Sequence, residues 1–179
     1  EIRDAERSGR PVVASGTANA SADRGYAVHV EATGLKPATR DAYRFTLGDF
    51  SAEGQTLTAP AGGTTPDKIR FASCSCAEYE FAFPHAYELM ARDEPDFIVH
   101  LGDYIYETTG DPSFQNSTGR RIEFTDESGA IELHDAQGNV FHAAASVSNY
   151  RELYRFYRAD PILQRLHERF AFVCIWDDH

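Results

Sequence analysis

Three clusters of side chains in this sequence could bind metal ions. A thiolate binds iron or zinc, a carboxylate offers hard oxygens to cations, and a histidine exchanges a proton near neutral pH. A phenol becomes a ligand only beside a strong Lewis acid such as ferric iron, because its pKa is ordinarily about 10. The side chains of these kinds that follow apolar segments are Cys74, Asp103, Tyr106, Asp177, Asp178 and His179.

Each cluster also has a simpler structural explanation. Asp103 could cap a turn while Tyr106 packs on a sheet, and the Asp pair before His179 could cap a helix. Cys74 could be a buried, unreactive thiol, which is the commoner fate of cysteine. Cys76 is the competing sulfur ligand, and we favour Cys74 because it closes its strand directly. No single motif decides the function, because short motifs often match by chance.

The elements that must position these clusters alternate between strands and helices. Continuous apolar runs predict buried strands, and amphipathic spacing or a proline in the first turn predicts helices. The predicted strands span 68–74, 96–103 and 170–179, and the predicted helices span 84–95, 148–161 and 161–170. This alternation predicts an α/β fold. Ligands bind outside the carboxyl ends of strands in such sheets, so the three clusters should meet at one edge.

Residues 1–60 have the different pattern of a β-domain. Short alternating segments separated by turn residues predict a β-sandwich module. These segments span 11–20, 25–33 and 42–50. GLKPATRDAYRF resembles the fibronectin type III pattern, with Asp41 where a corner tyrosine is usual. Residues 61–67 are rich in Ala, Gly, Thr and Pro and are expected to be a linker.

Three other features receive ordinary structural interpretations. The polar stretch over roughly 107–147 has little periodicity, so we expect a long loop there. His100 lies inside a predicted strand and should be a packed, hydrogen-bonded core residue. Cys174 lies in the apolar run FAFVCIW and should pack as a small hydrophobe.

Composition and charge narrow the function classes. The 179 residues carry 28 acidic and 17 basic side chains, which gives a formal net charge of −11. Such a chain repels nucleic acid, and it can hold an anionic substrate only if bound cations supply a positive field. Three cysteines cannot form a complete disulfide framework within the chain. No apolar run approaches the roughly 18 residues of a membrane span.

Together, the motifs resemble the PhoD-like alkaline phosphatases of the calcineurin-like metallophosphoesterase superfamily. The resemblance rests on FASC (71–74), DFIVHLGDYIYE (96–107) and NYRELYRFYRADPILQRLHERFAFVCIWDDH (149–179). It implies the first half of a metallophosphoesterase α/β sandwich over 68–179, preceded by a partial fibronectin-III-like β-sandwich over 1–60. The resemblance also implies that the chain is a fragment, truncated at its C-terminus and inactive without the missing half of the domain.

The resemblance implies a role for each matching residue. Cys74, Asp103 and Tyr106 would bind a ferric ion (Fe3+), and Asp103 would also bridge toward calcium (Ca2+). Asp178 would stand where the superfamily has its bridging Asn. His179 would stand where the superfamily has its catalytic His.

The implied activity is hydrolysis of phosphate mono- or diesters by a metal-activated hydroxide, with small phosphate esters as substrates. The family is typically secreted or periplasmic, so the resemblance implies export. Asp177 has no firm role and would either support a cation from behind the ligands or shape the turn. Two alternatives remain: a non-catalytic β-sandwich binding module with an inert phosphatase remnant, and a Cys-His hydrolase with Cys74 as nucleophile.

Overall fold

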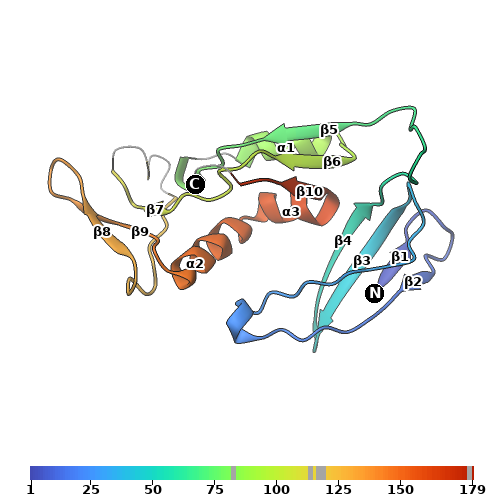
Figure 1. Ribbon diagram of the computed structural model, residues 1–179, viewed down its shortest axis with the longest axis horizontal. Helices are drawn as coiled ribbons and strands as arrows, with labels where there is room; N and C mark the ends of the chain where they lie inside the picture. The colour runs from blue at the N-terminus through green and yellow to red at the C-terminus, as the bar shows by residue number, and fades with distance from the viewer. Residues whose placement is uncertain (82–83, 113–114, 116–119, 177–178) are drawn as a thin grey trace.

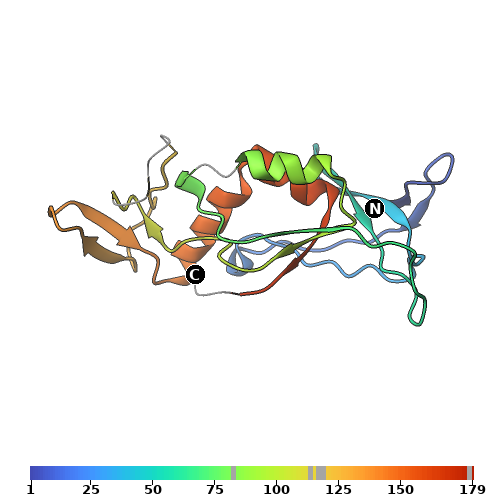
Figure 2. The same ribbon diagram turned by 90° about the horizontal axis from the view of Figure 1, so that it is seen from above.

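The computed structural model describes residues 1–81, 84–112, 115, 120–176 and 179 (Figure 1). These residues form a mixed α/β fold of three β-sheets and three α-helices. The sheets follow one another along the long axis of the molecule, and the parallel sheet lies in the middle (Figures 1 and 2). None of the described helices combines the length and the apolar character that crossing a membrane requires.

The N-terminal sheet is antiparallel, with strand order β2-β1-β3-β4. Its strands are β1 (Ile2–Asp4), β2 (Val12–Ala14), β3 (Arg40–Leu47) and β4 (Phe50–Leu57), and a short 3-10 helix, η1 (Ala22–Arg24), precedes β3. The predicted strand over 25–33 is wrong, because this segment pairs with no strand in the described part of the chain. Its alternating pattern lacks a partner, which leaves Val28 and Val30 exposed.

The central sheet is parallel, with order β10-β6-β5. Its strands are β5 (Phe71–Cys74), β6 (Phe97–His100) and β10 (Ala171–Cys174), as the apolar runs predict. The register places Cys74, His100 and Cys174 side by side, so the three strands end at the same level. The loops that follow these strands therefore leave the sheet at one edge.

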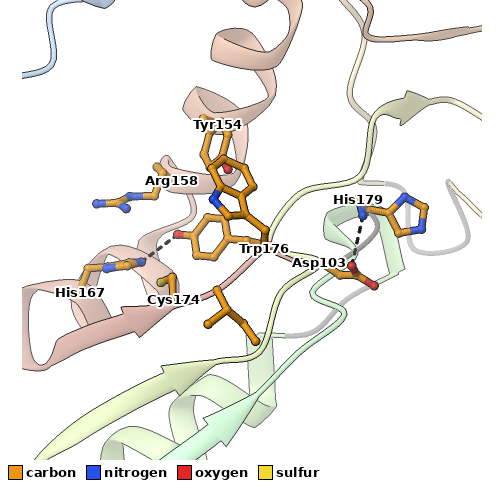
Figure 3. Close-up of a pocket in the computed structure, with 9 residues that line it drawn as sticks. Asp103, Tyr154, Arg158, His167, Cys174, Trp176 and His179 are labelled. Atoms are coloured by element: carbon orange, nitrogen blue, oxygen red, sulfur yellow. Dashed lines mark hydrogen bonds between the residues drawn. The ribbon is translucent and has the colours of Figure 1, made fainter.

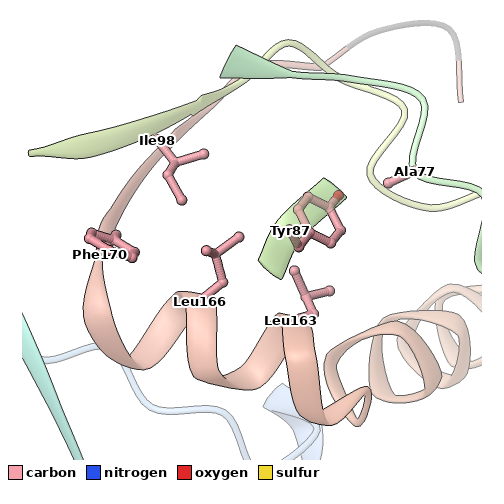
Figure 4. Packing of buried hydrophobic residues seen from close by; sticks show 6 residues of the cluster. All are labelled: Ala77, Tyr87, Ile98, Leu163, Leu166 and Phe170. Carbon is pink, nitrogen blue, oxygen red and sulfur yellow. The ribbon is translucent and has the colours of Figure 1, made fainter. Parts of the chain in front are cut away.

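Helices α1 (Pro84–Arg92) and α3 (Pro161–Arg169) cover one face of the central sheet (Figure 2). Ile98 of β6 is fully buried between them, against Tyr87 of α1 and Leu166 of α3 (Figure 4). A cluster of this kind stabilises the sheet because each buried aliphatic side chain contributes roughly 1.5–3 kcal/mol. The packed central sheet therefore holds the ends of the loops at its edge in fixed positions.

Helix α2 (Val147–Arg158) begins at a capping box, in which the side chains of Ser146 and Asn149 each bond the other's backbone. Asp160 then caps α3 through hydrogen bonds from the backbone N–H groups of Ile162 and Leu163. Helices α2 and α3 lie where the sequence predicts them. A second core packs Leu153 and Tyr157 of α2 against Ile105, Ile122 and Phe124.

The stretch predicted as a long loop contains a third sheet, and this prediction is wrong. Strands β7 (Thr108–Thr109), β8 (Ile131–His134) and β9 (Val140–Ala143) are antiparallel, in the order β7-β9-β8. Glu80, in the 3-10 turn η2 (Tyr79–Phe81), is fully buried and accepts a 2.7 Å hydrogen bond from the Ile122 N–H. This carboxylate joins the segment after β5 to the stretch before β8.

The N-terminal sheet packs on the central region through β4 and α3. Gly54 sits at this contact: a Cβ there would lie 2.2 Å from the Tyr43 Oη and 2.6 Å from the Glu168 carbonyl oxygen. The Tyr43 hydroxyl donates a 3.5 Å hydrogen bond to the His167 carbonyl. A side chain at position 54 would force these groups apart.

Candidate metal centre

The loops after β5 and β6 are joined by backbone hydrogen bonds at the edge of the central sheet. The Cys76 N–H donates to the Gly102 carbonyl at 3.3 Å, and the Ala77 N–H donates to the Asp103 carbonyl at 2.9 Å. Gly102, Asp103 and Cys76 have φ angles of 105°, 51° and 58°. Left-handed backbone at two non-glycine residues is strained, and such strain concentrates at functional sites.

Asp103 is the centre of a group of potential ligands. Its buried carboxylate Oδ2 lies 3.5 Å from the Cys76 Sγ and 3.4 Å from the Tyr106 Oη. Two donors bound to one ion, with bonds of roughly 2.0–2.3 Å, are separated by about 3–3.7 Å. A thiol, a carboxylate and a phenol at this spacing therefore fit a shared cation.

Electrostatics at this centre also fit a cation. Burial raises the pKa of Tyr106, and the neighbouring Cys76 and Asp103 raise it further. Three groups that each become anionic repel one another, so they need a positive charge to ionise together. In the described residues, no three His, Cys, Asp or Glu side chains gather to hold a metal. The third donor here is a phenol.

His179, which follows strand β10, lies beside Asp103. Its backbone N–H donates to the Asp103 Oδ1 at 3.4 Å (Figure 3). Its ring Nδ1 lies 2.8 Å from the Glu107 Oε2, and its ring centroid lies 4.4 Å from that of Tyr106. The predicted site residues Asp177 and Asp178 lie outside the described residues.

Cys74 occupies a different environment from Cys76. Its side chain is part-buried against the central core, where its thiol is hydrogen-bonded with Tyr87. Burial raises the pKa of Cys74 to about 11, the Tyr87 bond lowers it, and Cys174 raises it. A thiol with this pKa is a poor nucleophile at neutral pH, which argues against a Cys-His hydrolase that uses Cys74.

The segment after β5 and the segment after β6 share a single anchor on α2. The Tyr157 hydroxyl oxygen, which is fully buried, accepts hydrogen bonds from the backbone N–H groups of Tyr79 at 3.2 Å and Tyr106 at 3.3 Å. Its own proton points to the Glu78 Oε1, 3.4 Å away. The Tyr157 side chain thus fixes the backbone of both segments at one point.

Two ordinary interpretations from the sequence need correction. His100 is fully buried, as predicted, but neither ring nitrogen has a hydrogen-bond partner within the part of the chain that the structure describes. Burial lowers the pKa of His100, which keeps the ring neutral. Cys174 is exposed at the edge of the sheet and does not pack as a core residue.

Sequence reasoning missed two residues near the site. Glu107 lies inside the motif GDYIYE, one residue after Tyr106, and its position was the available signal. Arg158, in the last turn of α2, lines a cavity together with Asp103 and His179. In the sequence, Arg158 lies in a stripe of aromatic and arginine residues that is typical of core packing. Nothing in that pattern indicates that Arg158 lines a cavity.

Comparisons with known proteins show the family of the chain. The family described as PhoD-like phosphatase matches residues 71–179, and the PhoD-like phosphatase N-terminal domain matches residues 1–60. Alkaline phosphatase D of Bacillus subtilis (strain 168) is 34% identical over 171 residues, which cover 95% of this chain and 27% of that protein. A solved structure of PhoD is 32% identical with a TM-score of 0.75, over 99% of this chain and 31% of the other.

The chain thus spans between a quarter and a third of the length of these two proteins. The two family matches together account for nearly all of its residues, including every strand of the central sheet. The likeness of the solved structure extends through both the N-terminal and the central sheets, because it covers 99% of the chain. This chain belongs to the PhoD-like phosphatase family.

Proposed function

We propose that this chain carries part of the active site of a metal-dependent phosphoesterase of the alkaline phosphatase D type, which hydrolyses phosphate mono- or diesters. One observation carries the proposal. Asp103 lies within 3.5 Å of a thiol, a phenol and the backbone of His179, at the edge where three parallel strands end. The family membership supports the same reaction class.

The proposed ligands of a ferric ion are Cys76, Asp103 and Tyr106. Cys76 replaces Cys74 in this set, because the Cys74 side chain belongs to the core beside Tyr87 whereas Cys76 contacts Asp103. Asp103 would also bridge toward calcium through its other oxygen. When bound, the cations supply an activated water and a positive field for the phosphoryl oxygens.

His179 is the proposed proton donor to the leaving oxygen. Asp178 is proposed as a further metal ligand, and Asp177 as a residue that supports a cation from behind the ligands. Glu107 accepts a hydrogen bond from the His179 Nδ1 in this assignment, which leaves Nε2 to exchange the proton with substrate. The 4.4 Å approach of the Tyr106 ring restricts the orientation of the imidazole. Glu107 is thus a positioning residue for His179.

We also propose a division of the chain into a partial fibronectin-III-like β-sandwich (1–60), a linker (61–67) and the first part of a metallophosphoesterase α/β sandwich (68–179). The two family matches, which end at residue 60 and begin at residue 71, support this division. Small phosphate esters are the proposed substrates, because the net charge of −11 disfavours nucleic acid. Secretion or a periplasmic location is proposed from the resemblance alone.

Visible spectroscopy tests the proposed ligand set. Titration of the chain with ferric iron should produce a tyrosinate-to-iron charge-transfer band. Tyr106→Phe should abolish this band, and Cys76→Ser should shift it and weaken iron binding. Cys74→Ser is the matched control, with the same chemical change two residues away, and should leave the band in place. A band that survives Tyr106→Phe, or one that responds to Cys74→Ser alone, would contradict the assignment.

A further inference from the structure

A cavity of about 240 Å³ shares a wall with the candidate metal centre. It lies between the end of β10 and helices α2 and α3 (Figure 3). Its lining residues beyond Asp103 and His179 are Tyr104, Tyr154, Arg158, His167, Cys174, Ile175 and Trp176. A space of this size is smaller than a typical drug-sized site, so it accommodates a substituent rather than a whole large ligand.

Arg158 is the cationic side chain of this cavity. It is exposed and hydrogen-bonded to the Tyr104 phenol, and the part of the chain that the structure describes offers it no carboxylate within 4.0 Å. A guanidinium next to a cavity is a ready receptor for a carboxylate, sulfonate or phosphate group.

Two of the polar groups in the cavity wall, His167 and Tyr154, are neutral at working pH. Burial lowers the pKa of His167 to about 3, so its imidazole carries no charge. Burial also raises the pKa of Tyr154, which keeps its phenol protonated. The positive charge of Arg158 therefore remains available to an anion that enters the cavity.

The cavity wall is held in place without a ligand. The Tyr104 Oη lies 2.8 Å from the His167 Nε2, and the His167 ring stacks on Phe172 at 3.8 Å between centroids. Tyr104 also stacks on Tyr154, with centroids 5.9 Å apart. A wall fixed by these contacts loses little conformational entropy on binding, which favours affinity.

A role for Arg158 in helix capping does not explain its position. Arg155 and Arg158 both lie in the last turn of α2, where a positive charge favours the helix dipole. Either arginine serves that purpose. Only Arg158 of the two is among the described residues that line the cavity beside Asp103 and His179.

We propose that this cavity is a substrate subsite and that Arg158 binds a second anionic group, carried on the alcohol part of the phosphate ester. This inference rests on the proposed phosphoesterase function, because it assumes that the ester phosphate is held at the Asp103 centre. It predicts a preference for substrates with two separated negative charges over esters of uncharged alcohols.

The test uses the metal-loaded chain and two probes with the same three-carbon chain, 3-sulfopropyl phosphate and propyl phosphate, of which only the first carries a second anionic group. Trp176 is the single tryptophan of the chain and lines the cavity, so its fluorescence reports binding there. We expect the sulfonate probe to bind about tenfold more tightly, which is the usual effect of one charge-assisted hydrogen bond. Arg158→Gln should remove this preference.

Arg155→Gln is the matched control, with the same loss of charge one turn away, and should keep the preference. Equal binding of the two probes to the unmodified chain would overturn the subsite, as would a preference that survives Arg158→Gln or disappears equally in Arg155→Gln. Phosphate release is measured separately. If neither probe is hydrolysed but the Arg158-dependent preference persists, the proposed function fails and the subsite stands. If both are hydrolysed at equal rates with equal affinities, the subsite fails alone.

Discussion

The N-terminal sheet and the central sheet use buried carboxylates in opposite ways. In the antiparallel N-terminal sheet, Asp4 and Asp41 face each other across β1 and β3, and the Asp41 Oδ2 has no partner in the described part of the chain. In the central sheet, the buried Asp103 lies beyond a strand end and contacts Cys76 and Tyr106. Both sites bury an acid, but the Asp4 carboxylate accepts hydrogen bonds from the backbone of Glu6 and Arg7, whereas Asp103 lies beside a thiol and a phenol.

The difference follows from strand direction. Neighbouring antiparallel strands end at opposite edges, so polar residues that follow them are spread over the sheet. Parallel strands all end at one edge, so segments about 25 and 75 residues apart in the chain deliver their polar side chains to one place. The potential metal-binding side chains therefore lie together at one edge of the central sheet. Four predictions test this difference between the two sheets.

The largest expected effect is on metal binding. Asp103→Ala should weaken ferric iron binding by more than about 100-fold, because it removes the group that contacts both other proposed donors. Asp41→Asn is the control from the N-terminal sheet and should leave iron binding unchanged. Metal analysis after gel filtration, with competition titration for the affinity, measures both. Equal iron retention in the two variants would remove the distinction between the carboxylates.

The next effect is on stability. Leu166→Ala should reduce the free energy of unfolding by about 2–5 kcal/mol, because Leu166 is almost fully buried beneath the central sheet. Leu47→Ala, at an exposed end of β3, should change it by less than about 0.5 kcal/mol. Urea unfolding followed by circular dichroism measures both. A large effect at Leu47 would show that the N-terminal sheet buries this side chain in solution.

The contact between the two regions gives a smaller effect. Gly54→Ala should destabilise the chain by about 1–3 kcal/mol, because the new methyl group would overlap the Tyr43 hydroxyl and a carbonyl of α3. Gly62→Ala, in open space within the predicted linker, is the control and should be nearly neutral. Thermal unfolding of the two variants tests this. Similar melting temperatures would mean that the two sheets do not pack together as described.

The smallest effect is a pH dependence. His167 is neutral in the folded chain because burial lowers its pKa to about 3 from an ordinary 6.5. The unfolded chain then binds more protons between those pH values, so stability should fall as the pH drops from about 6.5 towards 3. The expected loss at pH 5 is about 1–2 kcal/mol. His167→Gln should flatten this dependence in urea unfolding between pH 7 and 5, whereas an unchanged slope would exclude His167 as its source.

The sequence predicts the central region well because its signals are local. The apolar runs of β5, β6 and β10, the Asp160-Pro161 start of α3 and the turn after Gly102 each depend on neighbouring residues. The N-terminal and third sheets are harder to predict. Residues 25–33 alternate like a strand but find no described partner, and β8 and β9 are short strands within a polar stretch. Pairing between strands is a property of the whole fold, which a local pattern does not reveal.

The choice between Cys74 and Cys76 shows the same limit within the candidate site. The sequence places Cys74 at the strand end, and β5 does end there. Side chains alternate along a strand, so Ala72 and Cys74 share the face that packs on the helices. Cys76 reaches Asp103 because its left-handed backbone turns the chain after the strand. That turn depends on hydrogen bonds with the neighbouring loop, which the sequence does not show.

The phenol of Tyr157 has a consequence for how this site can vary. It accepts hydrogen bonds from the backbone of both segments that carry the proposed ligands, so neither segment can shift without breaking a bond that also fixes the other. Exchange of a side chain on either segment leaves these backbone bonds in place, whereas insertions that change the path of either backbone are penalised together. Related chains should therefore differ in which side chains they offer to the proposed ion more readily than in the spacing between the two segments.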